Sequence, residues 1–110
     1  MTLDKCACSV GSGDLQVFAT PAMIALMENA AMLAAKDSLP EGSTTVGVEM
    51  QTSHIKASAL GANIKASATL VEVDGRRLTF DVKAWDEKAT IGEGRHVRFV
   101  VDRERFLSKL

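Results

Sequence analysis

The longest apolar stretch of the chain lies within residues 20–40. Over Ala22–Ala35 only Glu28 and Asn29 interrupt a run of Ala, Met, Leu and Ile residues. Most of these residue types favour helix, and the run contains no Gly or Pro. A helix on a protein surface normally carries one polar face, which this stretch lacks. The pattern therefore predicts a long helix that is buried on most sides.

The ends of this helix have their own signals. Thr20 is suited to cap the first turn with its hydroxyl, and Pro21 is suited to the first helical position. Pro40 and Gly42 are typical of residues that follow a helix end. An unpaired buried charge is costly, so Glu28 needs either a partner or a raised pKa that serves a purpose.

Alternating apolar and polar residues predict strands in the second part of the chain. The sequence Asp74-Gly75 predicts a two-residue hairpin turn between two of them. Gly47 interrupts the first of these strands, and a glycine there indicates a bulge or a close approach to the backbone. The predicted strands are residues 43–55, 63–73, 76–86 and 91–101, with one more at Leu3–Val10 and a helical tail at 102–110.

Strands joined by such short turns pair antiparallel, and their apolar face needs a cover. The helix of residues 20–40 is the one element apolar enough to provide it. The expected fold is therefore of the α+β class, a hot-dog fold in which an antiparallel sheet wraps around one long central helix. At 110 residues, we expect a single domain over residues 1–110.

Composition and charge make some classes of function less favoured. The formal net charge of −1 gives no indication of a basic surface that binds nucleic acid. The N-terminus has no signal-peptide pattern and the helix is too interrupted for a confident membrane span, so we expect a cytoplasmic protein. Cys6 and Cys8 are too few for a zinc site or a disulfide framework and are expected to pack in the interior.

Several residues have side chains suited to chemistry, each with a structural alternative. Glu28 is a candidate base or nucleophile, or else the partner of an Arg or Lys from a strand. His54 is suited to proton transfer, and His96, which stands between arginines, is expected to be structural. Thr20 could position water or substrate. The backbone N–H of Gly47 is a candidate donor to a developing oxyanion.

Five segments of the sequence resemble the fluoroacetyl-CoA thioesterase-like family of hot-dog proteins. They are residues 17–28 (VFATPAMIALME), 44–47 (TTVG), 53–55 (SHI), 73–80 (VDGRRLTF) and 91–102 (IGEGRHVRFVVD). The resemblance covers about residues 15–106. It implies hydrolysis of acyl-CoA thioesters by a homodimer without metal or organic cofactor, coenzyme A being part of the substrate. It also implies that Thr20, Glu28 and His54 form the catalytic set.

One departure from that family concerns the segment before the helix. The namesake enzyme has an aromatic-rich lid there, whereas residues 6–14 contain no aromatic side chain. Hydrolysis of a small acyl-CoA is therefore expected rather than selectivity for fluoroacetyl-CoA. The alternatives are a non-catalytic module that binds or senses acyl-CoA and, less favoured, a hot-dog hydratase or dehydratase acting on acyl thioesters.

Geometry adds one expectation about assembly. Eight residues separate Thr20 from Glu28, which places them about 12 Å apart along the helix axis. The two cannot form a tight pair within one helix. A homodimer with active sites at the subunit interface is the simplest way to bring them together.

Overall fold

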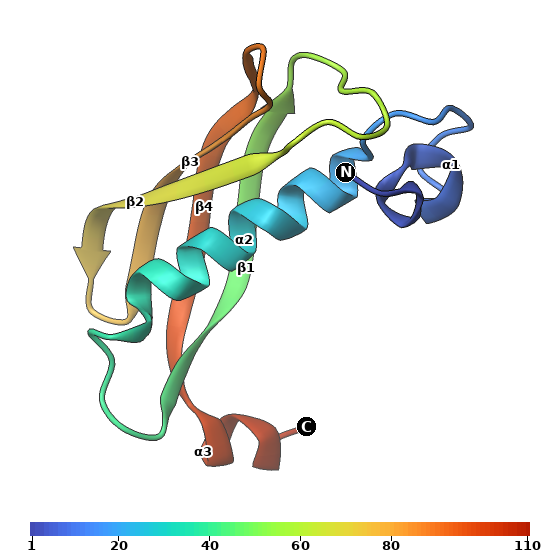
Figure 1. Cartoon of the computed structure of the whole chain (residues 1–110). Coiled ribbons are helices and arrows are strands. Elements are labelled where there is room, and N and C mark those ends of the chain that lie inside the picture. Colours follow the sequence, from blue (N-terminus) through green and yellow to red (C-terminus); the bar gives the residue numbers. More distant parts are fainter.

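One long helix, α2 (Thr20–Lys36), lies diagonally across a four-stranded antiparallel sheet in the computed structural model, which describes residues 1–110 (Figure 1). The strands are β1 (Ser43–His54), β2 (Lys65–Asp74), β3 (Arg77–Trp85) and β4 (Thr90–Asp102). The other helices are η1 (Leu3–Lys5), α1 (Ala7–Val10) and α3 (Arg103–Ser108). The α+β class and the antiparallel sheet around a central helix are confirmed.

The strand order in the sheet is β1-β4-β3-β2, and every neighbouring pair is antiparallel. β2 and β3 form the predicted hairpin, but Asp74 pairs with Arg77, so the two central turn residues are Gly75 and Arg76. The turn is thus one residue later than Asp74-Gly75. Gly75 has φ +60°, a conformation that primed hairpin turns require and that glycine adopts without strain.

The core lies between α2 and the sheet. On the helix it is formed by a single stripe, Met23, Met27, Ala31 and Ala35, which packs against β3 residues such as Phe80. The expectation of burial on most sides is wrong for the single chain, because Met32 is 36% and Leu33 is 52% exposed. The helix also ends at Lys36 instead of near Pro40, and Asp37 and Ser38 form a turn before the proline.

The strand predicted at Leu3–Val10 is wrong. These residues form η1 and α1, and only Cys6 makes an isolated bridge, to Phe18. The backbone closes its hydrogen bonds locally instead, and Gly11, at φ +90°, ends α1 in a left-handed conformation. Cys6 is buried and Cys8 is exposed, so only the first packs inside as expected.

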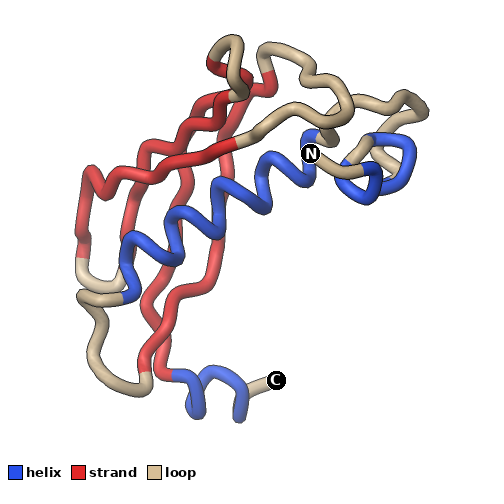
Figure 2. Tube along the Cα trace, in the orientation of Figure 1, coloured by secondary structure: helices blue, strands red, loops and turns tan.

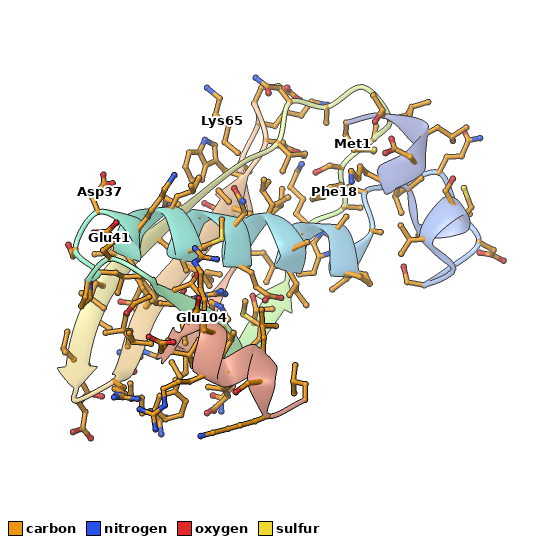
Figure 3. All side chains as sticks on the ribbon, turned by 90° about the horizontal axis from the view of Figure 1, so that it is seen from below. Met1, Phe18, Asp37, Glu41, Lys65 and Glu104 are labelled. Carbon is orange, nitrogen blue, oxygen red and sulfur yellow. The ribbon has the colours of Figure 1, made fainter.

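The segment before α2 and the loop of residues 55–64 lie side by side at one end of the molecule (Figure 2). Phe18 is at that end of α2, and Asp37 and Glu41 are at the other (Figure 3). α3 extends from β4 near that second end and confirms the predicted helical tail. None of the helices combines the length and the apolar character needed to span a membrane.

β1 is an edge strand, because β4 is its only partner in the sheet. Its pairing shifts between Gly47 and Glu49, which confirms the irregularity predicted at Gly47. Val48, the extra residue, is 52% exposed. Edge strands present unpaired backbone groups that can pair with another chain.

Candidate active site

Thr20 and His54 meet at the N-terminal end of α2. The Thr20 Oγ1 lies 2.8 Å from Nδ1 of His54, the last residue of β1. The predicted capping role of Thr20 is wrong: Ala19 is the N-cap residue, and no side-chain capping bond forms there. The hydroxyl makes its side-chain hydrogen bond with the histidine instead. The structure thus brings two of the three candidate catalytic residues together within one chain.

The ring of His54 is held on several sides and leaves one nitrogen free. Phe18 packs edge-on against it, with ring centroids 6.3 Å apart and an angle of 79° between the rings. Nε2 is buried and has no hydrogen-bond partner within the chain. Burial lowers the pKa of His54, and the nearby backbone of Lys56 opposes this shift. A buried polar atom without a partner is uncommon and points to a partner outside the chain.

A cavity of about 220 Å³ opens beside this pair. Thr20, His54 and Lys56 line it, together with Ala7 and Ser12 from the N-terminal segment. The segment without aromatic residues therefore does form part of the wall, and it contributes small side chains. Val17 and Phe18 also line the cavity, and its small volume suits a small acyl group.

Asp86 anchors the loop that follows His54. Its carboxylate lies 2.7 Å from Lys56 Nζ and 2.9 Å from the Ser58 hydroxyl, and it also accepts the backbone N–H groups of Lys88 and Ala89. The hydrogen bond with Lys56 is the main reason that the pKa of Asp86 is well below its usual range. Sequence reasoning missed this residue; the available signal was an acidic residue directly after a strand, in a short turn.

Glu28 lies elsewhere, beside the bulge of β1. Its Oε2 is 3.8 Å from the Arg98 guanidinium, and a Cβ added to Gly47 would lie 3.0 Å from the same oxygen. The side chain of Glu28 is 42% exposed, whereas that of Arg98 is 8% exposed. The alternative of an ion pair with a strand arginine is thus present. Gly47 is close to another group, as predicted, because the carboxylate approaches its backbone.

Arg98 is the residue of this half-site that sequence reasoning did not single out. It donates to the hydroxyl and the carbonyl oxygen of Thr45 and to Nε2 of His96. Burial lowers the pKa of Arg98, and the charge of Glu28 opposes this shift. The guanidinium therefore holds a fixed positive charge next to Glu28.

His96 has the structural role that the sequence predicts. It is 1% exposed, and its two ring nitrogens bond the carbonyl oxygen of Glu49 and the guanidinium of Arg98. Because the carbonyl can only accept and the guanidinium can only donate, Nδ1 carries the proton and Nε2 does not. Both nitrogens are occupied, so His96 has no atom free for substrate.

The two half-sites are separated within one chain. Gly47 and His54 are seven positions apart on β1, about 23 Å along an extended strand, and Thr20 and Glu28 are eight positions apart on α2, about 12 Å along its axis. One half-site therefore contains Thr20 and His54, and the other contains Glu28 with Gly47 and Arg98.

Comparison with known proteins identifies the family of the chain. The family model of FlK, the fluoroacetyl-CoA-specific thioesterase, matches residues 1–104. The fluoroacetyl-CoA thioesterase of Streptantibioticus cattleyicolor is 37% identical over 95 residues, which are 86% of this chain and 68% of that protein.

Solved structures of related proteins share the overall fold of this chain. A mutant of FlK in complex with fluoroacetate and CoA has a TM-score of 0.90 at 31% identity, covering 96% of this chain and 90% of that chain. A thioesterase superfamily member from Thermus thermophilus, 22% identical, has a TM-score of 0.91 over 99% of this chain and 81% of its own, which shows the shared fold. The hot-dog fold is thereby confirmed, and the chain belongs to the family of fluoroacetyl-CoA-specific thioesterases.

Proposed function

We propose that this protein is an acyl-CoA thioesterase that works as a homodimer, each active site combining Thr20 and His54 of one chain with Glu28 of the other. Family membership supports the thioester hydrolase activity. The main observation in favour of a two-chain site is that His54 Nε2 is buried without a partner. Glu28, the expected third residue, is held in the second half-site of the same chain.

Exposed surface around β1 supports the dimer. β1 has a free edge of 12 residues, and the exposed side chains of Val48, Met32 and Leu33 are apolar. Two copies of β1 can pair antiparallel across a two-fold axis, which extends the sheet from one subunit into the next. With the axis near Met50, His54 lies opposite the partner's Val46, next to the partner's Gly47 and therefore near the partner's Glu28.

The proposed reaction uses water and balances without a cofactor. Glu28 removes a proton from water, the resulting hydroxide attacks the thioester carbonyl, and the carbon–sulfur bond breaks. His54 donates a proton from Nε2 to the leaving thiolate and regains one from Glu28, while Thr20 holds the imidazole ring through Nδ1. Backbone N–H groups at the start of α2 stabilise the oxyanion, with the Gly47 N–H as a second candidate.

Direct attack by the Glu28 carboxylate, through a mixed anhydride, is the other route to the same products. A single turnover in ¹⁸O-labelled water separates the two routes. The general-base route places the label in the released acid alone, whereas the anhydride route places it in Glu28 when water attacks the anhydride at that side chain. In either case the products are a free acid and CoA.

Small acyl groups are the proposed substrates. The cavity beside Thr20 and His54 has a volume of about 220 Å³, and Ala7 and Ser12 form part of its wall. Acetyl-CoA and propionyl-CoA should therefore be hydrolysed without the selectivity for fluoroacetyl-CoA expected of an aromatic lid. The free thiols of Cys6 and Cys8 suit a reducing compartment, and we place the activity in the cytoplasm.

Subunit complementation tests the two-chain site. Glu28→Gln and His54→Ala should each be inactive alone, whereas mixing and refolding them together should restore about a quarter of wild-type activity, because half of the dimers regain one intact site. The matched control mixes Thr20→Val with His54→Ala. These two changes fall in the same half-site, so this mixture should regain nothing.

Absence of rescue in the first mixture would place the whole site within one chain and contradict the proposal. The competing function is a module that binds or senses acyl-CoA. It predicts that short acyl-CoAs raise the melting temperature without any release of free thiol.

A further inference from the structure

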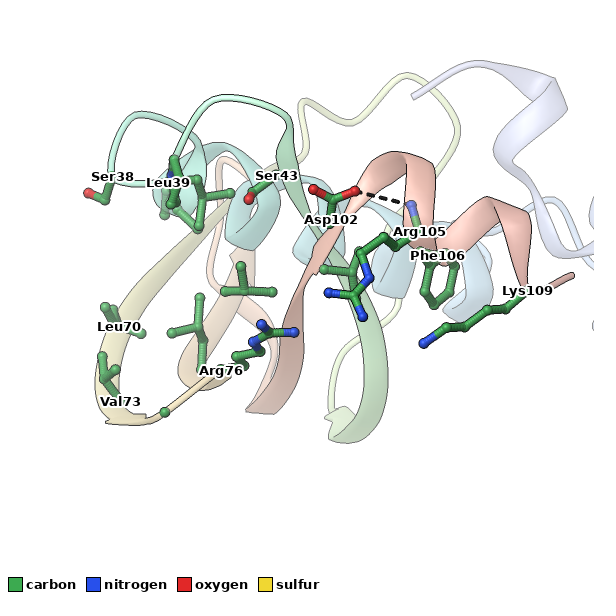
Figure 4. A pocket seen from close by; sticks show the side chains of 17 residues that line it. Ser38, Leu39, Ser43, Leu70, Val73, Arg76, Asp102, Arg105, Phe106 and Lys109 are labelled. Atoms are coloured by element: carbon green, nitrogen blue, oxygen red, sulfur yellow. Dashed lines mark hydrogen bonds between the residues drawn. The ribbon is translucent and has the colours of Figure 1, made fainter.

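A second, larger cavity lies at the opposite end of α2 from Thr20. It has a volume of about 800 Å³ and is enclosed by the C-terminal end of α2, the β2–β3 hairpin and α3 (Figure 4). It is distinct from the small cavity at the Thr20–His54 pair. Nothing in the half-sites described above makes use of it.

Positive charge gathers at this cavity. Arg76, Arg105 and Lys109 line it, against a single acidic residue, Asp102. None of the three cations forms an ion pair, and the Asp102 carboxylate accepts the backbone N–H of Arg105 at the start of α3. The chain as a whole has a net charge of −1, so this concentration of free cations is a local feature that favours an anion.

The opposite wall is apolar. Leu39, Leu70 and Val73 lie across the cavity from the residues of α3, and Phe106 adds an aromatic ring on the side of the cations (Figure 4). Phe106 is 37% exposed, so part of its surface is free to contact a ligand. An aromatic ring beside guanidinium groups is the combination that binds a nucleobase together with its phosphates.

A smaller cavity adjoins this one, beside the helical turn that follows Glu28. A cavity of about 220 Å³, lined by Met32 and Leu33, shares Leu39 and Ser43 with the larger one. Met32 is one helical turn beyond Glu28, and the end of α2 at the large cavity is about 10 Å along the axis from it. A pantetheine arm, with two amide linkages, is about as long as four extended residues, roughly 14 Å. The arm is therefore long enough to connect the two places.

We propose that the large cavity binds the nucleotide end of coenzyme A, the 3′-phosphorylated ADP group, while the pantetheine arm passes the smaller cavity to reach Glu28. Phe106 stacks on the adenine, and Arg76, Arg105 and Lys109 hold the phosphates. This inference rests on the proposed function and adds where the CoA part of the substrate is recognised. It also predicts that recognition comes from the subunit that supplies Glu28.

Binding of adenosine 3′,5′-bisphosphate, which lacks the pantetheine arm, tests the cavity directly by calorimetry. The test variant is Arg76→Glu/Arg105→Glu. The control is Lys83→Glu/Lys88→Glu, which changes the net charge equally at exposed lysines outside the cavity. The test variant should weaken binding tenfold or more, and the control should match the wild type. Equal binding by the wild type and the test variant, or no binding by the wild type, would overturn the proposal.

Kinetics on two substrates give a second readout. The acetyl thioester of N-acetylcysteamine offers the same reacting bond as acetyl-CoA without the nucleotide. The ratio of kcat/KM for acetyl-CoA to that for the short ester should fall at least tenfold in Arg76→Glu/Arg105→Glu and in Phe106→Ala. An unchanged ratio would overturn the proposal, and so would competition by a fatty carboxylate in place of the bisphosphate.

The two proposals fail in different ways. If neither thioester is hydrolysed but the bisphosphate binds and the test variant loses it, the cavity assignment stands and the thioesterase function fails. If both esters are hydrolysed and the ratio does not change, the function stands and the cavity assignment fails.

Discussion

The hydroxyl of Thr20 lies 2.8 Å from Nδ1 of His54, although 34 residues separate them in the sequence. This contact occupies one ring nitrogen and leaves Nε2 buried and free. The first residue of α2 and the last residue of β1 are thereby joined into one half-site.

The Thr20 hydroxyl should matter for turnover. We expect Thr20→Val to lower kcat by about 10- to 100-fold, because the ring of His54 loses the group that orients it, a part of what general acid–base catalysis contributes. Thr20→Ser keeps the hydroxyl and should retain most activity. Steady-state hydrolysis of acetyl-CoA measures both variants. Equal activity of the valine and serine variants would mean that the hydroxyl has no role.

The proposed catalytic role of Glu28 can be measured separately from the contribution of its ion pair with Arg98 to stability. Glu28→Gln should remove nearly all turnover, yet lower the free energy of unfolding by only about 1 kcal/mol or less, because the carboxylate is partly exposed and 3.8 Å from the guanidinium. Urea unfolding and thiol release, measured on the same sample, check this pair of effects. An unfolded Glu28→Gln variant would instead give Glu28 a structural role.

Arg98→Met should lower the free energy of unfolding more than Glu28→Gln does. It leaves the buried acceptors of Thr45 and His96 without their donor, which we expect to cost on the order of 2–3 kcal/mol in the free energy of unfolding. The same urea titration measures it. A variant as stable as Glu28→Gln would show that these hydrogen bonds contribute little.

The pH dependence of stability should report the burial of His54. Burial lowers its pKa below 6.5, so the folded chain binds this proton less tightly than the unfolded chain does. The contribution of neutral His54 is fully present above about pH 6.5 and is lost as the pH falls from there through the lower pKa of the folded chain. The free energy of unfolding should therefore fall more between pH 7.5 and 5.5 in the wild type than in His54→Gln. Parallel curves for the two proteins would contradict this.

Gly94 is required by the pairing of β1 with β4. A Cβ at this position would lie 2.0 Å from the backbone oxygen of Gln51, which cannot move without breaking the strand pairing. Gly94→Ala should cost about 1–3 kcal/mol or more in the free energy of unfolding. Glu93→Ala, at the exposed neighbouring residue, should stay within about 0.5 kcal/mol of the wild type. Thermal unfolding compares the three proteins.

Local chemistry in the sequence was sufficient for much of the fold. The run of Ala, Met and Leu predicts α2 within four residues at its end, and alternation predicts all four strands of the sheet within one or two residues at each end. The same reasoning gave a wrong prediction at Leu3–Val10, because a short apolar pattern is compatible with either strand or helix. Local hydrogen bonds favoured the helix there. It also failed for the cap of α2, because Thr20 bonds a residue far away in sequence.

The amino-acid sequence is enough to predict the helices and strands of the core and the residue types at the candidate site, since propensity and periodicity act over a few neighbouring residues. Which side chains meet was decided by tertiary structure alone. Arg98 reaches Glu28, Asp86 holds the loop after His54, and Phe106 lines a cavity with residues from α2 and β2. Each of these contacts depends on strand register and on the angle of the helix across the sheet, which arise only when the whole core packs.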